Sequence, residues 1–436
     1  MSRIIRILLI IIGLLLAISI TARAQTTSPK IDVLTIKGTI NPVLVDYIGR
    51  GIEQAEVTGA QAVVIQMDTP GGLDTAMRDI IQNIINAKIP VVVYVSPAGA
   101  RAASAGAYIT LAAHVAAMAP NTAIGAATPI AMGGEGEAPM SDEMKAKVIN
   151  DAVAYIRDIA ESHGRNADWA EKAVREGVSA TSQEALELNV VDMIAPDLNA
   201  LIAQLDGKQV TMLDGSVMTL QTKGAPINQV GMKTIENFLY VIADPNIAFL
   251  LLSIATLGIM IEIFNPGLIF PGVVGAICGI LAFYSLGQLP VNIAGVLLIL
   301  LAFGFFIGEV LTTTFGLFTA GGVTALVIGS LILFQGAAPV FRVDPWLIAI
   351  VTITIAGLFA FVVNRAIRAH RKQASTGREE LIGKRAVVKV VLDPEGTVFF
   401  KGERWAAISD QGRIESGEEV IITSIDGLTL HVIKKQ

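Results

Sequence analysis

The sequence has little cysteine and little histidine, and each shortage excludes a kind of site. Its single cysteine, Cys278, lies inside an apolar run, so neither an intrachain disulfide nor a cysteine-based metal site can form. The histidines do not stand at the HxxxH or HExxH spacing that zinc proteases use. We therefore expect no metal and no cofactor. The four histidines are His114, His163, His370 and His431.

Charge is also scarce. Charged residues make up 16% of the 436 residues, hydrophobic residues make up 53%, and the formal net charge is −6. An ordinary soluble protein carries roughly 25% charged residues, so part of this chain is expected to lie in lipid. Because the balance is acidic and no stripe of lysine and arginine occurs, we expect no nucleic acid among the partners.

The first 24 residues have the pattern of a secretory signal. Arg3 and Arg6 precede an apolar core over residues 7–20, and Ala22-Arg23-Ala24 has the small-residue spacing of a cleavage site. The alternative is an uncleaved anchor, although the core is short for a full span. In both cases the chain from Gln25 onward begins on the exported side of the membrane, which is the periplasmic side of a bacterial inner membrane.

Residues 25–235 have the pattern of an α/β domain. Short β-rich runs over residues 31–38, 62–68 and 89–96 alternate with amphipathic stretches such as residues 73–87. This alternation predicts crossover units and a mostly parallel sheet. Apolar residues at helical spacing predict a long helix near residues 142–162.

Five apolar stretches follow and predict a membrane domain over residues 245–365. Each is close to the length that spans a bilayer as a helix, and the second and fourth are marginal. A basic cluster after the last stretch predicts a cytoplasmic end, which agrees with an odd number of spans. Glu262 and Glu309 lie near the ends of stretches, so we interpret both as interfacial. The stretches are residues 246–264, 270–286, 291–310, 317–334 and 346–363.

The tail over residues 380–436 consists of five short β-rich segments separated by glycine, with no long helix. This pattern predicts a small all-β barrel of the OB type on the cytoplasmic side.

Two glycine-containing runs follow predicted strands, where active-site loops of α/β folds lie. Gly71 and Gly72 let the backbone approach a ligand and direct N–H groups at an oxyanion. A simple strand-to-helix turn is the alternative for this run. In the second run, Ser104 stands among alanine and glycine before an apolar helix, as an accessible nucleophile requires. Taken alone, this serine is better interpreted as a helix cap.

A serine nucleophile needs a base. His114 is interpreted as a core residue, and His163 lies at a helix end. A lysine can replace histidine where desolvation favours the neutral amine. Lys145 and Lys147 open the long helix, and as residues i and i+2 they point to different faces, so only one can face the site.

In combination, the runs DTPGG, GARAASAG, AMAPNTAIGAA and KVINDAVAYIRDIAESHGRN resemble the long-form NfeD family, membrane-bound relatives of Clp-type serine peptidases. The resemblance covers nearly the whole mature chain. It implies a Clp/crotonase fold, a spiral of ββα units, and a Ser-Lys dyad of Ser104 and Lys147, with Lys145 as the second choice. It also implies an oxyanion hole made by Gly71, Gly72 and the N–H of Ala105.

The resemblance further implies cleavage of apolar segments of membrane-associated proteins, a stomatin-like or prohibitin-like partner, and a homo-oligomer. The chain lacks the histidine that soluble Clp peptidases place beyond the serine, which puts a histidine-based triad in doubt. The alternative is a non-catalytic membrane scaffold that organises the same kind of partner. An acyl-CoA enzyme is disfavoured because a secretory signal separates it from its substrate pool.

Overall fold

The computed structural model describes residues 30–129, 141–312, 316–334, 341–371 and 381–435, with side chains up to residue 361 in the fourth range. The expected signal over residues 1–24 lies outside them. So does Lys372, the last residue of the predicted basic cluster of Arg365, Arg368, Arg371 and Lys372. The chain divides into one compact unit that ends at Thr354 and a second that begins at Ile355, and each is described by itself.

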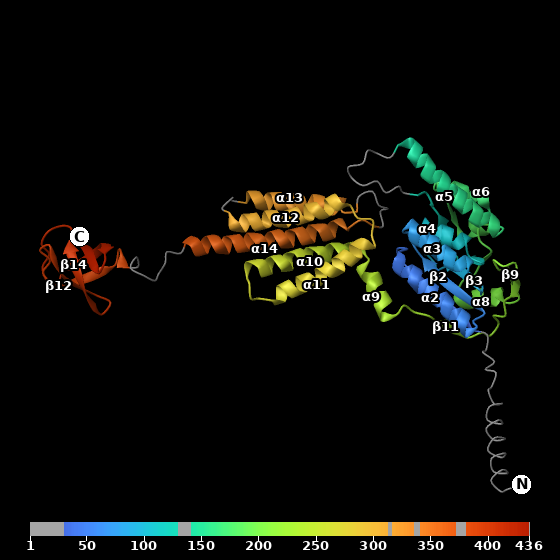
Figure 1. The fold of residues 1–436 in the computed structure, drawn as a ribbon, viewed down its shortest axis with the longest axis horizontal. Helices are drawn as coiled ribbons and strands as arrows, with labels where there is room; N and C mark the ends of the chain where they lie inside the picture. The colour runs from blue at the N-terminus through green and yellow to red at the C-terminus, as the bar shows by residue number, and fades with distance from the viewer. Residues whose placement is uncertain (1–29, 130–140, 313–315, 335–340, 372–380, 436) are drawn as a thin grey trace, which may run out of the picture. The chain divides into compact units, whose positions relative to one another are not determined.

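A six-stranded parallel sheet organises the first part of the chain (Figure 1). Its strands are rich in valine and isoleucine, and most of their side chains are buried on both faces, as parallel sheets require. The order is β11-β1-β2-β3-β5-β8. The strands are β1 (Ile31–Lys37), β2 (Ala62–Asp68), β3 (Val91–Val95), β5 (Val115–Met118), β8 (Met193–Ile194) and β11 (Ile227–Gln229).

Helices cover both faces of this sheet. One face packs against α2 (Pro42–Thr58), α3 (Asp74–Ile85) and α4 (Ala105–Leu111), and the other against α8 (Leu198–Leu205) and the hairpin of β9 (Gln209–Thr211) and β10 (Val217–Thr219). The amphipathic period of α3 buries Met77, Ile80, Ile81 and Ile84 on one side. The predicted α/β class is confirmed.

A second, three-stranded sheet lies at the carboxyl ends of the main strands. It joins β4 (Arg101–Ala103) to β6 (Ala123–Gly125) in parallel, and β6 to β7 (Ser179–Thr181) antiparallel. Two strand-strand-helix units therefore follow each other, β3-β4-α4 and β5-β6-α5. The helices α5 (Asp142–Ser162), α6 (Ala167–Arg175) and α7 (Ser182–Glu187) complete the domain, and α5 has the predicted bounds.

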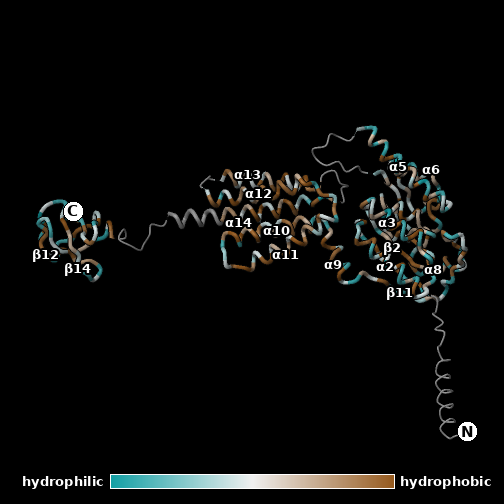
Figure 2. Tube along the Cα trace, viewed as in Figure 1, coloured by the Kyte–Doolittle hydropathy of each residue, from teal (hydrophilic) through white to brown (hydrophobic). Residues whose placement is uncertain are grey.

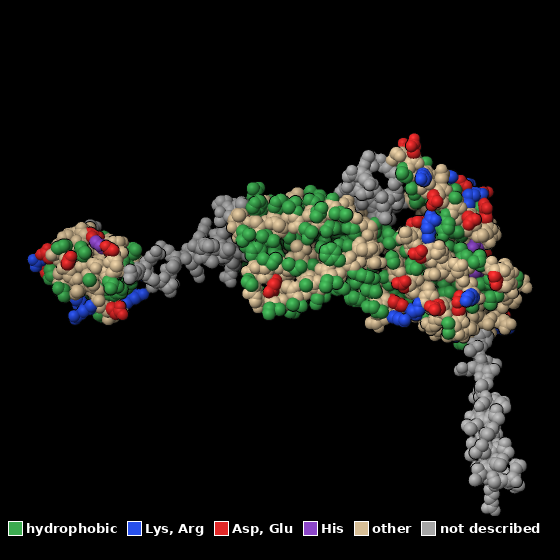
Figure 3. All heavy atoms as spheres, viewed as in Figure 1, with side chains coloured by type: hydrophobic (Ala, Val, Ile, Leu, Met, Phe, Trp, Pro, Cys, Tyr) green, Lys and Arg blue, Asp and Glu red, His purple; other side chains and the backbone are tan. Residues whose placement is uncertain are grey.

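Each predicted apolar stretch contains a helix, and a short helix, α9 (Thr234–Ile242), precedes the first of them. Three are long and apolar enough to cross a membrane, whereas α13 and the apolar part of α14 are shorter. Their tubes are mostly brown in Figure 2, and in Figure 3 their surface carries many hydrophobic and few charged side chains. The helices are α10 (Pro245–Phe264), α11 (Phe270–Gly287), α12 (Ile293–Leu311), α13 (Leu317–Ile332) and α14 (Pro345–Arg371).

Small residues bring these helices together in pairs. A Cβ on Gly275 would lie 2.9 Å from the carbonyl oxygen of Ala255, and one on Gly295 would lie 2.9 Å from that of Gly329. Such close backbone approach is typical of helices packed in lipid. Glu309 lies near the end of α12, is 3% exposed and accepts hydrogen bonds from the N–H groups of Gly316 and Thr319 at the start of α13. Its interfacial position stays a prediction.

The described residues near the C-terminus form a closed five-stranded barrel, so the predicted small all-β domain is confirmed. Its strand order is β12-β13-β14-β16-β15, and β14 runs parallel to β16. The barrel buries its own apolar core, which includes Val388, Val398 and Val420. The strands are β12 (Arg385–Val390), β13 (Glu395–Phe400), β14 (Glu403–Ser409), β15 (Glu419–Asp426) and β16 (Thr429–Lys434).

Candidate active site

Ser104 lies at a strained turn between β4 and α4. Its φ is 51° and its ψ is −118°, a backbone conformation that residues other than glycine rarely adopt. The Ser104 N–H donates to the carbonyl oxygen of Gly125 at 3.0 Å. The Ser104 carbonyl oxygen accepts a hydrogen bond from the N–H of Ala107 at 2.9 Å. Although Ser104 precedes the helix, its side chain makes no capping hydrogen bond. The interpretation as a helix cap is therefore wrong.

Gly71 and Gly72 are required by close approach of the backbone. A Cβ on Gly71 would lie 2.7 Å from the Cβ of Ser104 and 3.2 Å from its Oγ, and the φ of Gly71 is +117°. A Cβ on Gly72 would lie 2.1 Å from the carbonyl oxygen of Ile40. The loop after β2 can pass beside Ser104 because Gly71 lacks a side chain, and beside Ile40 because Gly72 lacks one.

The N–H groups of this loop differ in availability. The Gly71 N–H donates to the Thr69 hydroxyl at 3.1 Å, so it is already paired. Gly72 donates its N–H to no acceptor in the described part of the chain. Ala105 is the first residue of α4, where an N–H has no partner within the helix. Gly72 and Ala105 are therefore the available donors.

Hydrogen bonds from distant segments hold this arrangement. The Thr69 N–H donates to the carbonyl of Arg101 at 2.8 Å, and the Ala103 N–H donates back to that of Thr69 at 3.1 Å. The Ile40 N–H donates to the carbonyl of Gly71 at 2.9 Å. The loops after β1, β2 and β3 thus meet around Ser104, at the carboxyl edge of the sheet.

In the described part of the chain, no lysine forms a hydrogen bond with Ser104. Lys145 and Lys147 are both exposed in the first turns of α5, and Lys145 lies 3.7 Å from Asp142. The described residues show no hydrogen bond from either lysine to Ser104. Lys147 shares a helix face with Asp151, one turn further along. The role of Lys147 as the base stays a prediction.

Arg78 joins α3, the helix that follows the glycine loop, to α5. Its guanidinium donates to Asp74 at 2.8 Å and to Asp151 at 2.9 Å, and it lies 4.3 Å from the ring centroid of Tyr155. Asp74 begins α3, two residues after Gly72. Sequence reasoning missed Arg78, because nothing in the local pattern joins residues 78 and 151.

His114 is half-buried, and its ring is hydrogen-bonded within the fold, as predicted. It lies beyond the C-terminal end of α4, and its Nδ1 accepts the N–H of Val91, the first residue of β3. Burial lowers the pKa of His114 to about 4, and nearby His163 and Arg165 act in the same direction. Because Ser104 lies at the other end of α4, this histidine cannot serve as its base.

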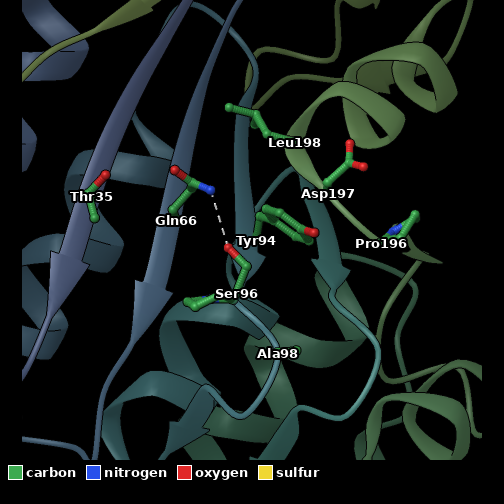
Figure 4. A pocket seen from close by; sticks show the side chains of 9 residues that line it. Thr35, Gln66, Tyr94, Ser96, Ala98, Pro196, Asp197 and Leu198 are labelled. Carbon is green, nitrogen blue, oxygen red and sulfur yellow. Dashed lines mark hydrogen bonds between the residues drawn. The ribbon is translucent and has the colours of Figure 1, made fainter.

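A separate cavity of about 240 Å³ lies on the α8 side of the sheet and does not include Ser104 (Figure 4). Gln66 and Ser96 line it, and the Gln66 side chain donates to the Ser96 hydroxyl at 3.3 Å. Tyr94, which pairs with Gln66 across β2 and β3, and Asp197 also line it. The helix α4, which Ser104 precedes, packs on the opposite face of the sheet.

These features define a class: an α/β domain with a serine at a strained turn between a glycine loop and a helix N-terminus, followed by membrane-competent helices and a small barrel. Family models match the chain as an NfeD1b N-terminal domain over residues 30–209, an NfeD integral membrane domain over 246–365, and an NfeD-like C-terminal, partner-binding domain over 378–434.

Two curated relatives cover nearly the whole chain. Membrane-bound protease PH1510 of Pyrococcus horikoshii is 40% identical over 412 residues, 93% of this chain and 93% of the relative. Membrane protein NfeD1b of Bacillus subtilis is 26% identical over 95% of this chain and 94% of the relative. The chain belongs to the NfeD family and is an integral membrane protein.

A solved structure of the 1510-N membrane protease specific for a stomatin homolog from Pyrococcus horikoshii is 35% identical, with a TM-score of 0.43. It covers 50% of this chain and 99% of that chain.

Proposed function

We propose that this protein is a membrane-bound serine endopeptidase in which Ser104 is the nucleophile. The observation that carries the proposal is the conformation of Ser104: its φ is positive, its hydroxyl makes no capping bond, and Gly71 lies directly beside it. A strained turn that frees a serine hydroxyl next to unpaired N–H groups is the arrangement that acyl transfer requires.

In the proposed reaction, a neutral lysine removes the Ser104 Oγ proton, and Oγ attacks the carbonyl carbon of the peptide bond. The oxyanion is held by the N–H groups of Gly72 and Ala105, while Gly71 provides the room for Ser104. The C–N bond then breaks and the lysine gives the proton to the leaving amine. Water, deprotonated by the same lysine, releases the acyl group and restores Ser104.

The base is Lys147 in this proposal, and Lys145 is the alternative. Because both are exposed, the first two turns of α5 must close over Ser104 when a peptide binds. Closure would exclude water, and desolvation favours the neutral amine that a general base requires. Arg78 supports this motion, because it already joins α5 to the helix that follows Gly72.

The domain organisation belongs to the same proposal. Residues 1–24 are a cleaved signal, residues 25–235 form a Clp/crotonase-type domain on the exported side, residues 245–365 span the membrane, and residues 380–436 form a cytoplasmic OB-type barrel. The active assembly is a homo-oligomer, since Clp-type folds commonly assemble.

The proposed substrate is an apolar segment of a membrane-associated, stomatin-like or prohibitin-like protein. A 40% identical relative is named a protease, and the C-terminal model is described as partner-binding. In this proposal the barrel holds the partner and the exported domain cuts it.

The test uses the full chain in lipid nanodiscs and a fluorogenic apolar peptide. Ser104→Ala should abolish cleavage, whereas Ser216→Ala, which changes an exposed serine far along the chain, should leave cleavage unchanged. Lys147→Ala should also abolish cleavage, with the exposed Lys172→Ala as its matched control. Loss of cleavage in Lys145→Ala with full cleavage in Lys147→Ala would identify Lys145 as the base. Full cleavage in Ser104→Ala would refute the proposed serine protease activity.

A non-catalytic membrane scaffold is the second candidate. It is favoured by one observation, that the described residues place no lysine within hydrogen-bond distance of Ser104. A fluorophosphonate probe separates the two proposals: covalent labelling that depends on Ser104 would refute a vestigial site. No labelling, together with partner capture that Ser104→Ala does not change, would favour the scaffold.

A further inference from the structure

The short helix α9 joins the α/β domain to the first membrane-competent helix, and its two sides differ. One side is bound to the α/β domain, since Arg50 donates to both carboxylate oxygens of Glu236, at 2.6 and 2.7 Å. The Tyr240 hydroxyl on the same side donates to the carbonyl of Lys37 at 2.9 Å.

The other side of α9 exposes large apolar side chains. Ile235 is 58% exposed, Phe238 is 45% exposed and Val241 is 49% exposed. The three stand at i, i+3 and i+6, so they lie along one helix face. In Figure 2 the tube of α9 is largely coloured as hydrophobic. Such a row of three exposed apolar side chains on a nine-residue helix indicates a surface that another molecule shields from water.

The position of α9 next to the membrane helices indicates that lipid covers its exposed apolar face. α9 ends at Ile242, and α10 begins at Pro245, so α9 stands at the water-facing end of a membrane-competent helix. The Ser285 hydroxyl in α11 donates to the carbonyl of Ile242. Trp346, which is 79% exposed, opens α14 at the same level, because the Asp344 N–H donates to the Asn246 side chain at 2.8 Å. Exposed tryptophan is enriched at the membrane–water interface.

The docked side of α9 also reaches the rim of the Ser104 site. A Cβ on Gly38 would lie 2.6 Å from the Tyr240 hydroxyl, so α9 packs directly on the loop after β1. The Gly38 N–H donates to the carbonyl of Asp68 at 2.9 Å, and Ile40 in the same loop bonds to Gly71. A short chain of bonded backbone therefore leads from α9 to the glycine pair.

We propose that α9 is an interfacial helix: Ile235, Phe238 and Val241 insert into the headgroup region of the bilayer, and Tyr240 and Glu236 hold the rim of the Ser104 site against it. An amphipathic helix lying in the interface plane binds lipid through such an apolar face. The site is thereby kept at the membrane surface and receives polypeptide that emerges from the bilayer. This last consequence rests on the proposed peptidase function, whereas the insertion of α9 does not.

The insertion is tested in nanodiscs of the full chain, with Cys278→Ser as background and an environment-sensitive NBD label on a new cysteine. Phe238→Cys is the test variant. Val57→Cys is the matched control, since Val57 is also apolar, is 82% exposed, and lies at the amino-terminal edge of the sheet. Lipids brominated near the headgroup should quench the label at 238 at least fivefold more than the label at 57.

Equal quenching at the two positions would refute the insertion. A blue-shifted label at 238 that brominated lipid does not quench would refute it as well, because a second copy or a partner protein would then cover α9.

A second measurement tests the consequence for the site. Phe238→Asp should leave cleavage of a soluble peptide unchanged and lower cleavage of a bilayer-inserted single-span substrate by about tenfold. Phe238→Leu should restore cleavage. Equal loss on both substrates would show that α9 only stabilises the fold. Absence of all cleavage in the unmodified protein would refute the proposed peptidase function and leave the quenching result intact.

Discussion

At the scale of single residues, the backbone conformation of Ser104 separates two interpretations that the sequence leaves open. A helix cap has extended backbone, which lets its side chain reach the second or third N–H of the helix. Ser104 has φ 51° and ψ −118° instead, and its hydroxyl does not cap α4. The hydrogen bond from the Ser104 N–H to Gly125 is part of what holds this conformation, and it joins residues that are distant in the sequence.

Gly71 provides the sharpest single-residue test of the site. Gly71→Ala would place a methyl group 2.7 Å from the Cβ of Ser104, so the nucleophile must move. We expect peptide cleavage to fall by about 100-fold, since small displacements at a reacting centre have such effects. The measurement is the rate of cleavage of the fluorogenic peptide.

Gly164→Ala is the matched control, because Gly164 also has a positive φ but open space around it. Gly164→Ala should lose about 1 kcal/mol of stability from backbone strain, and Gly71→Ala should lose more, because its methyl group also meets Ser104. Equal cleavage rates in the two variants would show that the close approach of residue 71 to Ser104 does not affect catalysis.

His114 predicts how the stability of the α/β domain depends on pH. The pKa of His114 is lowered to about 4 in the folded protein, whereas its ordinary value, which applies to the unfolded chain, is 6.5. The unfolded chain therefore binds the proton more tightly. Stability should therefore rise with pH between about 4 and 6.5 and be constant for this group above that window. The full change is on the order of 3 kcal/mol.

Thermal unfolding between pH 4.5 and 7.5 measures this dependence. His114→Asn keeps an acceptor for the Val91 N–H but does not titrate, so its pH dependence should be flatter. If the slope of stability against pH is unchanged in this variant, other groups cause the pH dependence. The first candidate is His163, whose pKa is also lowered by burial.

At the scale of elements, the local patterns predict the strands and long helices well. The runs over 31–38, 62–68 and 89–96 are strands, and α5 has the predicted bounds, because period and propensity act between near neighbours. The helix α9 is not predicted, because its nine residues are too few to show a clear helical repeat and lie directly before an apolar stretch. Its docking depends on Arg50, which is distant in the sequence.

The contact between α3 and α5 predicts an effect on activity without a large effect on folding. Arg78→Ala removes the bonds to Asp74 and Asp151, both of which are mostly exposed, so stability should fall by no more than about 1 kcal/mol. Cleavage should fall by about tenfold or more, because α5 carries the proposed base.

Arg157→Ala is the control for this prediction. Arg157 also forms exposed ion pairs from α5, but its partners are Glu161 in α5 and Asp168 and Glu171 in α6, away from the glycine loop. Similar loss of cleavage in both variants, measured with the same peptide and thermal scan, would contradict a specific role for Arg78.

At the scale of the whole molecule, the barrel is expected to fold without the rest of the chain. Residues 381–435 close a five-stranded barrel and bury their own apolar core. A fragment of residues 378–436 should show β-type circular dichroism and one cooperative thermal transition. Val388→Asp, which places a charge in that core, should abolish the transition, whereas Val390→Asp at an exposed position should not. Absence of a transition in the unmodified fragment would contradict autonomy.

The sequence by itself determined the order of modules: an α/β domain, apolar helices and a β barrel. These follow from composition and period, which depend on residues close along the chain. The tertiary structure decided that Ser104 does not cap its helix, that Gly72 and Ala105 rather than Gly71 offer unpaired N–H groups, and that α9 is bound to the rim of the site. Each of these depends on contacts between distant segments, which no local pattern encodes.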